Sequence, residues 1–202
     1  MVRKWLTSSG VFSQEIHHHT HIEAKMEKFT LQTIETAEDF ADYTELAALY
    51  DRAFPLNERS PIEEIMNEKS GMLKVLAFYN NAAFCGMAVT LTSEELVHII
   101  YLAVEEAVRG QGLGSMALGE IRKRYPGRKI VVDVERVEDG AANNDQRTRR
   151  MAFYLRNGYE ETPVSYRWRD EDYVILSCGG IMTGQEWGRF WKEVYERTGR
   201  DW

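Results

Sequence analysis

The sequence predicts an α/β (α+β) domain with a mixed, mainly antiparallel sheet and helices on both of its faces. Segments in which apolar residues alternate predict strands, and segments in which they recur every three or four positions predict helices. Asn80 and Asn81 between two apolar runs predict an antiparallel hairpin. The succession of strand, glycine-rich loop, helix and strand over residues 96–134 predicts a parallel βαβ unit.

The first half of the chain supplies most of the predicted sheet. A helix is expected to begin after Thr36, a typical N-cap residue, and to end before Pro55. A short helix should begin at Pro61. The expected elements are a strand at 29–34, helices at 36–54 and from 61, a hairpin at 72–92 and a buried strand at 95–104.

The second half continues with helices and a closing hairpin. The expected elements are a helix at 113–125, a strand at 129–134, a helix at 143–158, a hairpin at 162–178 and an amphipathic helix from 184. Trp187, Phe190 and Trp191 lie on one face of this last helix, which should pack on the core or on a partner subunit. A homodimer formed through this helix is a hypothesis.

Length and composition predict one globular domain with short additions. The chain has 202 residues, of which 44% are hydrophobic, enough for a sizeable core. Residues 1–25 show neither the helical nor the strand period and are expected to be a poorly ordered leader. Residues 26–180 are expected to form the domain, and residues 181–202 are expected to form the C-terminal helix. The leader's histidines, in "HHHTH", are expected to be solvated rather than to bind a metal.

Charge and cysteine content exclude several classes of protein. The net charge of −7 argues against a nucleic-acid-binding protein, although residues 109–129 carry six basic side chains and one acidic one, a patch that suits a small polyanion. No apolar run is long enough for a membrane helix, and no signal peptide is recognisable. Cys85 and Cys178 lie in predicted strands, which favours reduced thiols. We therefore expect a cytoplasmic protein without a metal.

The stretch "VRGQGLGS" is compared with three phosphate-binding patterns. It lacks the Lys and Ser/Thr of a Walker A loop, and its glycine spacing does not fit the dinucleotide fingerprint. It does fit Arg/Gln-x-x-Gly-x-Gly/Ala, with Arg109, Gly112 and Gly114. Backbone N–H groups at a helix N-terminus, close approach allowed by glycine and a nearby arginine would suit a pyrophosphate. A tight turn alone would not require Arg109.

Two motifs resemble those of the GNAT N-acetyltransferase superfamily. "YLAVEEAVRGQGLGSMAL" is similar to its acetyl-CoA motif and "RRMAFYLRNGYEE" to its downstream motif, and the resemblance spans roughly residues 29–180. It implies a sheet splayed between the fourth and fifth strands. It also implies that acetyl-CoA, as cosubstrate, binds two stretches of backbone, a strand end and the loop after it. These are Leu102, Ala103 and Val104, and Arg109, Gly110, Gln111, Gly112, Leu113, Gly114 and Ser115.

The resemblance also implies roles for side chains. Tyr154 matches the tyrosine that protonates the departing CoA thiolate, although a tyrosine on an apolar helix face is often only a core residue. Glu135 and Glu58 are candidates for the base that deprotonates the acceptor, with ion-paired or solvated acids and a water relay as alternatives. Asn143 is a candidate CoA ligand.

Three arginines depart from the family pattern. Arg147, Arg149 and Arg150 stand where many relatives carry Asn and Ala, so they could reach phosphate or face solvent. His98, alone in the middle of a strand, is expected to be a packed or hydrogen-bonded core residue.

The predicted function is transfer of an acetyl group from acetyl-CoA to a primary amine, on a small molecule or a peptide, by direct attack. The alternatives are a non-catalytic CoA-binding or sensing module and an acyltransferase that uses a longer acyl-CoA.

Overall fold

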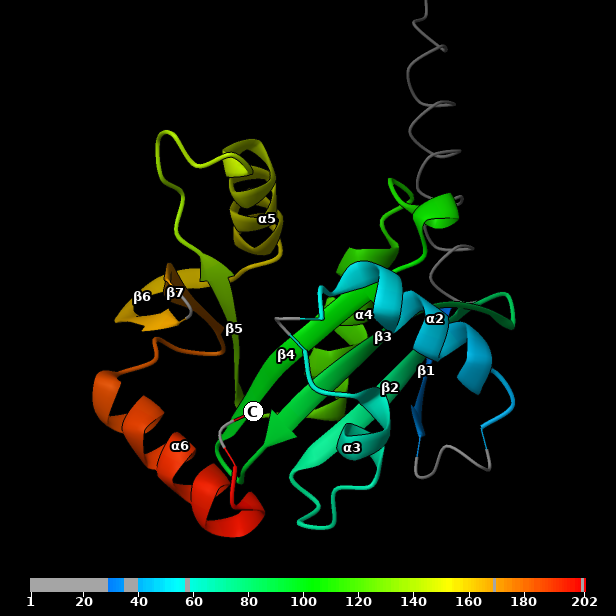
Figure 1. Ribbon diagram of the computed structural model, residues 1–202, viewed down its shortest axis with the longest axis horizontal. Helices are drawn as coiled ribbons and strands as arrows, with labels where there is room; N and C mark the ends of the chain where they lie inside the picture. The colour runs from blue at the N-terminus through cyan, green and yellow to red at the C-terminus, as the bar shows by residue number, and fades with distance from the viewer. Residues whose placement is uncertain (1–28, 35–39, 57–58, 169, 201) are drawn as a thin grey trace, which may run out of the picture.

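The computed structural model describes residues 29–34, 40–56, 59–168, 170–200 and 202. Within them, a seven-stranded sheet has the order β1-β2-β3-β4-β5-β7-β6 and carries helices on both faces (Figure 1). Neighbouring strands are antiparallel except β4 and β5, which are parallel. The predicted class is confirmed.

The element bounds are close to those expected from the sequence. The strands are β1 Phe29–Ile34, β2 Leu73–Asn80, β3 Ala83–Thr92, β4 Leu96–Val104, β5 Lys129–Glu135, β6 Glu160–Trp168 and β7 Glu171–Cys178. The helices are α2 Tyr43–Ala53, α3 Ile62–Met66, the single turn η1 Glu106–Val108, α4 Leu113–Arg124, α5 Asn144–Arg156 and α6 Gly184–Thr198.

Strands β4 and β5 separate part of the way along their length. Their parallel pairing runs only from Leu96, opposite Lys129, to Ile99, opposite Val132. Beyond this point β5 stays paired with β7, and β4 stays paired with β3 after a shift in register next to Ile99. The two strands therefore diverge, as Figure 1 shows, and the predicted splay between the fourth and fifth strands is confirmed. We call the end of the parallel pairing the apex.

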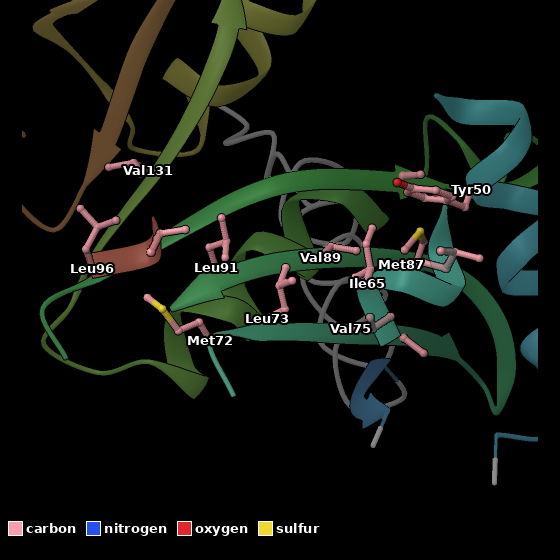
Figure 2. Close-up of a cluster of buried hydrophobic side chains, with 14 of the residues drawn as sticks. Tyr50, Ile65, Met72, Leu73, Val75, Met87, Val89, Leu91, Leu96 and Val131 are labelled. Carbon is pink, nitrogen blue, oxygen red and sulfur yellow. The ribbon is translucent and has the colours of Figure 1, made fainter. Parts of the chain in front are cut away.

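Each face of the sheet has its own apolar core. The front face, covered by α2, α3 and α6, includes the buried residues that Figure 2 shows, among them Tyr50, Ile65 and Leu91. The back face is covered by α4 and α5 and buries Leu118 and Tyr154. The alternation of side chains along a strand thus decides which core a residue enters.

Local structure agrees with most of the turn and cap signals. The turn after β2 places Asn81 and Ala82 at φ values of 52° and 63°, the conformation that a two-residue hairpin needs. Helix α2 begins at Tyr43, and the expected cap Thr36 lies outside the described residues, as do residues 1–25 with their histidines. Cys85 and Cys178 are both free thiols.

Helix α6 packs on this chain's own front face. It begins with a capping box between Thr183 and Glu186, and its buried residues Phe190 and Val194 belong to the front core. The structure therefore shows the aromatic face of α6 packed on the domain, which is one of the two predicted arrangements. Dimerisation through this helix stays a prediction. No helix in the described part of the chain is long and apolar enough to cross a membrane.

Candidate active site

Among the described residues, no side-chain cap is found at the N-terminus of α4, which follows the loop after β4. Gly110 and Gly112 have φ values of 76° and 81°, which favour glycine, and Gly112 is the N-cap residue of α4. Neither a side-chain cap nor an acidic residue occupies the first turn. Because the first N–H groups of a helix have no intrahelical acceptor, those of Leu113, Gly114 and Ser115 form a positively polarised site for an anion.

The third glycine of the loop has a packing role that the sequence did not reveal. A Cβ on Gly114 would lie 3.2 Å from Cζ of Phe153, so its absence lets α5 pack closely against α4. Phe153 precedes Tyr154, so Gly114 also helps to set the position of that tyrosine. Gly110 and Gly112 therefore allow the turn, and Gly114 allows α4 and α5 to pack closely. Both roles are compatible with a phosphate site.

The last residues of β4 present backbone to the splay. Ala88, Met87 and Gly86 of β3 pair with Leu102, Ala103 and Val104, respectively, on one side. No β5 residue pairs with this stretch on the other side, because the parallel ladder ends at Ile99. Alternate N–H and C=O groups of 102–104 consequently point into the splay.

Arg109 lies over the end of β4. Its Nε donates to the carbonyl oxygen of Val104 at 3.4 Å, and its side chain is exposed. A cation at this place adds to the positive end of α4.

Tyr154 of α5 is buried in the back-face core, to which α4 and β5 also contribute residues. Its ring makes edge contacts with Phe153 and Tyr159, with centroids 5.1 and 5.4 Å apart. Burial raises the pKa of the Tyr154 phenol to about 12; the charge of Arg150 opposes this shift and that of Asp133 adds to it. No hydrogen bond to its hydroxyl is found among the described residues. The phenol therefore keeps its proton at neutral pH and has it available for donation.

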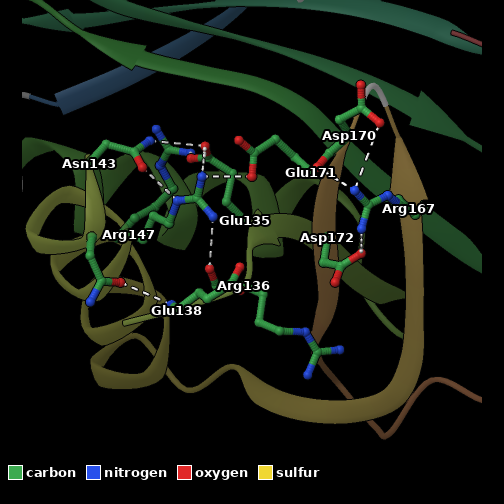
Figure 3. Close-up of polar contacts among 11 residues, drawn as sticks. Glu135, Arg136, Glu138, Asn143, Arg147, Arg167, Asp170, Glu171 and Asp172 are labelled. Carbon is green, nitrogen blue, oxygen red and sulfur yellow. Dashed lines mark hydrogen bonds and ion pairs between the residues drawn. The ribbon is translucent and has the colours of Figure 1, made fainter. Parts of the chain in front are cut away.

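Glu135 is ion-paired, which was one of the alternatives for this residue. One carboxylate oxygen accepts from the side-chain amide of Asn143 at 3.1 Å (Figure 3), and the other accepts from Arg150 at 2.8 Å. Arg147 lies 3.5 Å from the first oxygen. The negative charge of Glu135 is thus balanced within the protein. The other candidate base, Glu58, lies outside the described residues.

Arg147 forms the centre of the same network, where the sequence left its role open. Its Nε donates to Oδ1 of Asn143 at 2.7 Å, and its Nη atoms donate to the Arg136 carbonyl at 3.1 Å and to Glu171 at 2.7 Å (Figure 3). Its side chain is only 4% exposed, whereas Arg149 is exposed. The network ties the N-terminal turn of α5 to β5 and β7, so Arg147 and Asn143 hold the helix that carries Tyr154.

Replacing Arg147 by methionine is expected to lower the free energy of unfolding by about 2 kcal/mol or more. The change removes a buried guanidinium, so Oδ1 of Asn143 and the Arg136 carbonyl lose their part-buried donor and the half-exposed Glu171 loses its ion pair. Urea unfolding measures this effect. Arg149→Met, which removes an exposed guanidinium two residues away, is the control and should change stability by less than about 0.5 kcal/mol. Equal effects of the two substitutions would show that the network does not stabilise α5.

A second polar chain lies at the apex on the front face. His98 of β4, which is 2% exposed, has Nε2 at 2.7 Å from Oδ1 of Asp133 of β5, and the hydroxyl of Tyr166 donates to Oδ2 at 2.5 Å. The expectation of a hydrogen-bonded core histidine is confirmed. Sequence reasoning missed Asp133 and Tyr166. The signal for Asp133 was present, because it is the polar residue inside the apolar strand pattern "IVVDV".

The predicted CoA and catalytic residues that the structure describes lie on both sides of the splay. Leu102–Val104 and the loop 109–115 lie on its β4 side. Tyr154, on a helix that contacts β5, and Asn143 and Glu135, within the arginine network, lie on its β5 side.

The sequence of this chain was compared with protein-family models and with curated proteins. Residues 73–161 match a family model described as acetyltransferase (GNAT) domain. No match was found among curated proteins.

Many solved structures share the fold. A GNAT-family acetyltransferase from Bacteroides thetaiotaomicron is 21% identical with a TM-score of 0.69, covering 85% of this chain and 99% of that one. A ribosomal-protein alanine N-acetyltransferase from Escherichia coli is 20% identical with a TM-score of 0.54, covering 78% and 97%. A GNAT acetyltransferase from Elizabethkingia anophelis, with acetyl-CoA bound, is 18% identical with a TM-score of 0.51, covering 75% and 98%. Residues 73–161 thus match an acetyltransferase (GNAT) domain, and these solved structures of GNAT acetyltransferases share the fold of this chain.

Proposed function

We propose that this protein transfers an acetyl group from acetyl-CoA to a primary amine. The observation that carries the proposal is the uncapped N-terminus of α4 at the end of β4, on the side where β4 has left β5. A pyrophosphate on the amides of 113–115 would place the pantetheine arm along the unpaired edge of β4, which begins at residues 102–104 and continues back toward Ile99. The acetyl-CoA bound to the Elizabethkingia relative supports this choice of cosubstrate.

The chemistry would use few side chains. The amine nitrogen attacks the thioester carbonyl, the C–N bond forms and the C–S bond breaks. A β4 peptide N–H directed at the carbonyl oxygen would stabilise the negative charge that develops there. Tyr154 would give its proton to the departing thiolate sulfur and regain one from solvent. The amine proton leaves to water or to Glu58, whose role stays a prediction.

Release of free thiol from acetyl-CoA in the presence of a panel of primary amines tests the activity. Amine-dependent release is the expected result. CoA binding without turnover across the panel would favour a non-catalytic CoA-binding or sensing module. Faster turnover with a longer acyl-CoA than with acetyl-CoA would favour an acyltransferase that uses the longer acyl group. A cytoplasmic location likewise stays a prediction.

Ser115→Asp separates the phosphate site from the stability of α4. Ser115 is exposed in the first turn, where a carboxylate stabilises the helix but repels a pyrophosphate on the same amides. We expect the Kd for CoA to rise at least tenfold while the melting temperature stays the same or rises. Ser115→Asn, similar in size and uncharged, is the control. If both variants bind CoA like the wild type, as measured by isothermal titration calorimetry, the phosphates do not lie on α4.

A further inference from the structure

Asp133 occupies a special place at the apex. It is the first residue of β5 beyond the last parallel pair, Ile99 with Val132. Its neighbours Val132 and Val134 enter the back core, so the alternation along β5 directs Asp133 to the front face. His98, which lies between the back-core residues Val97 and Ile99, also points to the front, where it meets Trp187 and Trp191 of α6.

The carboxylate of Asp133 is held in place by two side chains, and the side chain as a whole is partly exposed. His98 and Tyr166 each engage one of its oxygens, and the side chain is still 21% exposed. A carboxylate can accept more than one hydrogen bond per oxygen, so both oxygens keep capacity for a further donor. Glu135, two residues away, differs because Arg150 and Arg147 balance its charge. No cationic Arg or Lys side chain forms an ion pair with Asp133 in the described part of the chain.

The apex is also where the acetyl group should arrive. This step rests on the proposed function. With the pyrophosphate at α4, the open edge of β4 from Val104 back to Ile99 spans roughly 16 Å at about 3.3 Å per residue, a length that suits an extended pantetheine arm. Paired backbone at Ile99 and Val132 blocks further travel. The thioester would therefore stop next to Asp133.

Aromatic rings stand beside this carboxylate. Tyr166 stacks on Tyr173 with centroids 5.3 Å apart and on Trp187 at 6.4 Å. All three side chains are half-buried. Such rings favour an organic cation, because their faces attract positive charge and their carbon surface packs against a carbon chain.

We propose that Asp133, held by His98 and Tyr166, binds the ammonium group of the acceptor, and that the acceptor is a cationic primary amine whose carbon chain packs against Tyr166, Tyr173 and Trp187. The amine then reaches the thioester from the front face, whereas Tyr154 lies on the back face and meets the departing sulfur. The acceptor amine, which loses a proton, and the CoA thiolate, which gains one, thus lie toward opposite faces of the sheet.

Asp133 acts in this scheme as a recognition residue rather than as a base. Burial raises the pKa of its carboxyl, but the adjacent His98 and the hydrogen bonds from His98 and Tyr166 outweigh burial and hold the pKa below its usual value. A carboxylate that stays ionised is a poor proton acceptor for an ammonium group and a good electrostatic partner for it. The ammonium proton leaves to water before attack.

Steady-state kinetics with 2-phenylethylamine as the probe test this assignment. Asp133→Asn should raise the KM for the amine at least tenfold and leave the KM for acetyl-CoA within twofold. Tyr166→Phe, which keeps the ring and removes one hydrogen bond, should raise the amine KM about threefold. Asp139→Asn removes an exposed carboxylate from the neighbouring loop and is the matched control, with no change in either constant.

Competition with uncharged 2-phenylethanol reports the recognition of charge. The wild type should prefer the amine at least tenfold over the alcohol, and Asp133→Asn should lose that preference. If Asp133→Asn has the same KM for the amine as the wild type, the inference about Asp133 is wrong, although the proposed acetyl transfer is not affected. If Asp133→Asn does not fold, an unchanged amine KM in Tyr166→Phe has the same consequence. If the wild type binds CoA but releases no thiol with any amine, the proposed function falls, and this inference with it.

Discussion

Tyr154→Phe is expected to lower turnover at least tenfold, and by up to about a hundredfold if proton donation to the thiolate limits the rate. The substitution keeps the ring, so the contacts with Phe153 and Tyr159 persist. It removes a hydroxyl for which the structure shows no hydrogen bond among the described residues, so stability should change by less than about 0.5 kcal/mol. The Kd for CoA should remain unchanged, because the proposed contacts of CoA are backbone groups of β4 and α4.

Tyr159→Phe is a matched control for this prediction. Tyr159 is also buried on the back face, and its buried hydroxyl has no hydrogen-bond partner among the residues that the structure describes. Removing that hydroxyl should leave turnover unchanged and should keep or slightly raise the stability. Single-turnover rates with saturating acetyl-CoA compare the two variants directly. Equal rates in wild type, Tyr154→Phe and Tyr159→Phe would remove Tyr154 from the mechanism and leave it as a core residue.

Gly86→Ala is expected to destabilise the protein by about 2 to 3 kcal/mol, which for a chain of this size is a fall in melting temperature of roughly 5 to 10 °C. A Cβ on Gly86 would lie 2.6 Å from the carbonyl oxygen of Ala103 and 3.3 Å from Cα of Val104. Backbone cannot rotate away as a flexible side chain can, so β3 and the end of β4 must separate. Ala103 and Val104 are expected CoA contacts, so the CoA Kd should rise as well.

Gly119→Ala gives the comparison for a glycine with space around it. Gly119 lies inside α4, and nothing lies within 4 Å of the Cβ that it would gain. Alanine is favoured over glycine in a helix interior by about 0.5 to 1 kcal/mol, so this variant should be more stable than the wild type. Thermal unfolding of the two alanine variants should therefore give shifts of opposite sign. Shifts of the same sign would contradict the close approach of β3 to β4.

The sequence predicted the elements well because local signals dominate there. Asn80 and Asn81 predicted the hairpin, and the two residues with positive φ in its turn are Asn81 and Ala82, one position further along the chain. The glycines and Arg109 marked the loop after β4. The start of α2 is less regular, since the helix begins at Tyr43 and the signal at Thr36 lies outside the described residues. Element bounds depend on such single residues, whereas element types depend on a period repeated over many positions.

The roles of the charged residues could not be predicted in the same way. Arg147 and Arg149 are two positions apart on one helix, yet one is buried among three hydrogen-bond acceptors and the other is exposed. The partners of Arg147 come from β5, the loop after it and β7, which only the folded sheet brings together. Glu135 was a candidate base from its place in the chain, and its ion pairs become visible only with α5 in position.

The sequence by itself determined the class of fold, the βαβ unit and the loop that suits a pyrophosphate, because each of these follows from residue types at short spacing. Tertiary structure decided which polar side chains face the splay. His98, Asp133 and Tyr166 are separated by 35 and 33 positions in the chain. Their contact depends on the strand order and on where β4 and β5 part, and both result from long-range packing of two cores on one sheet.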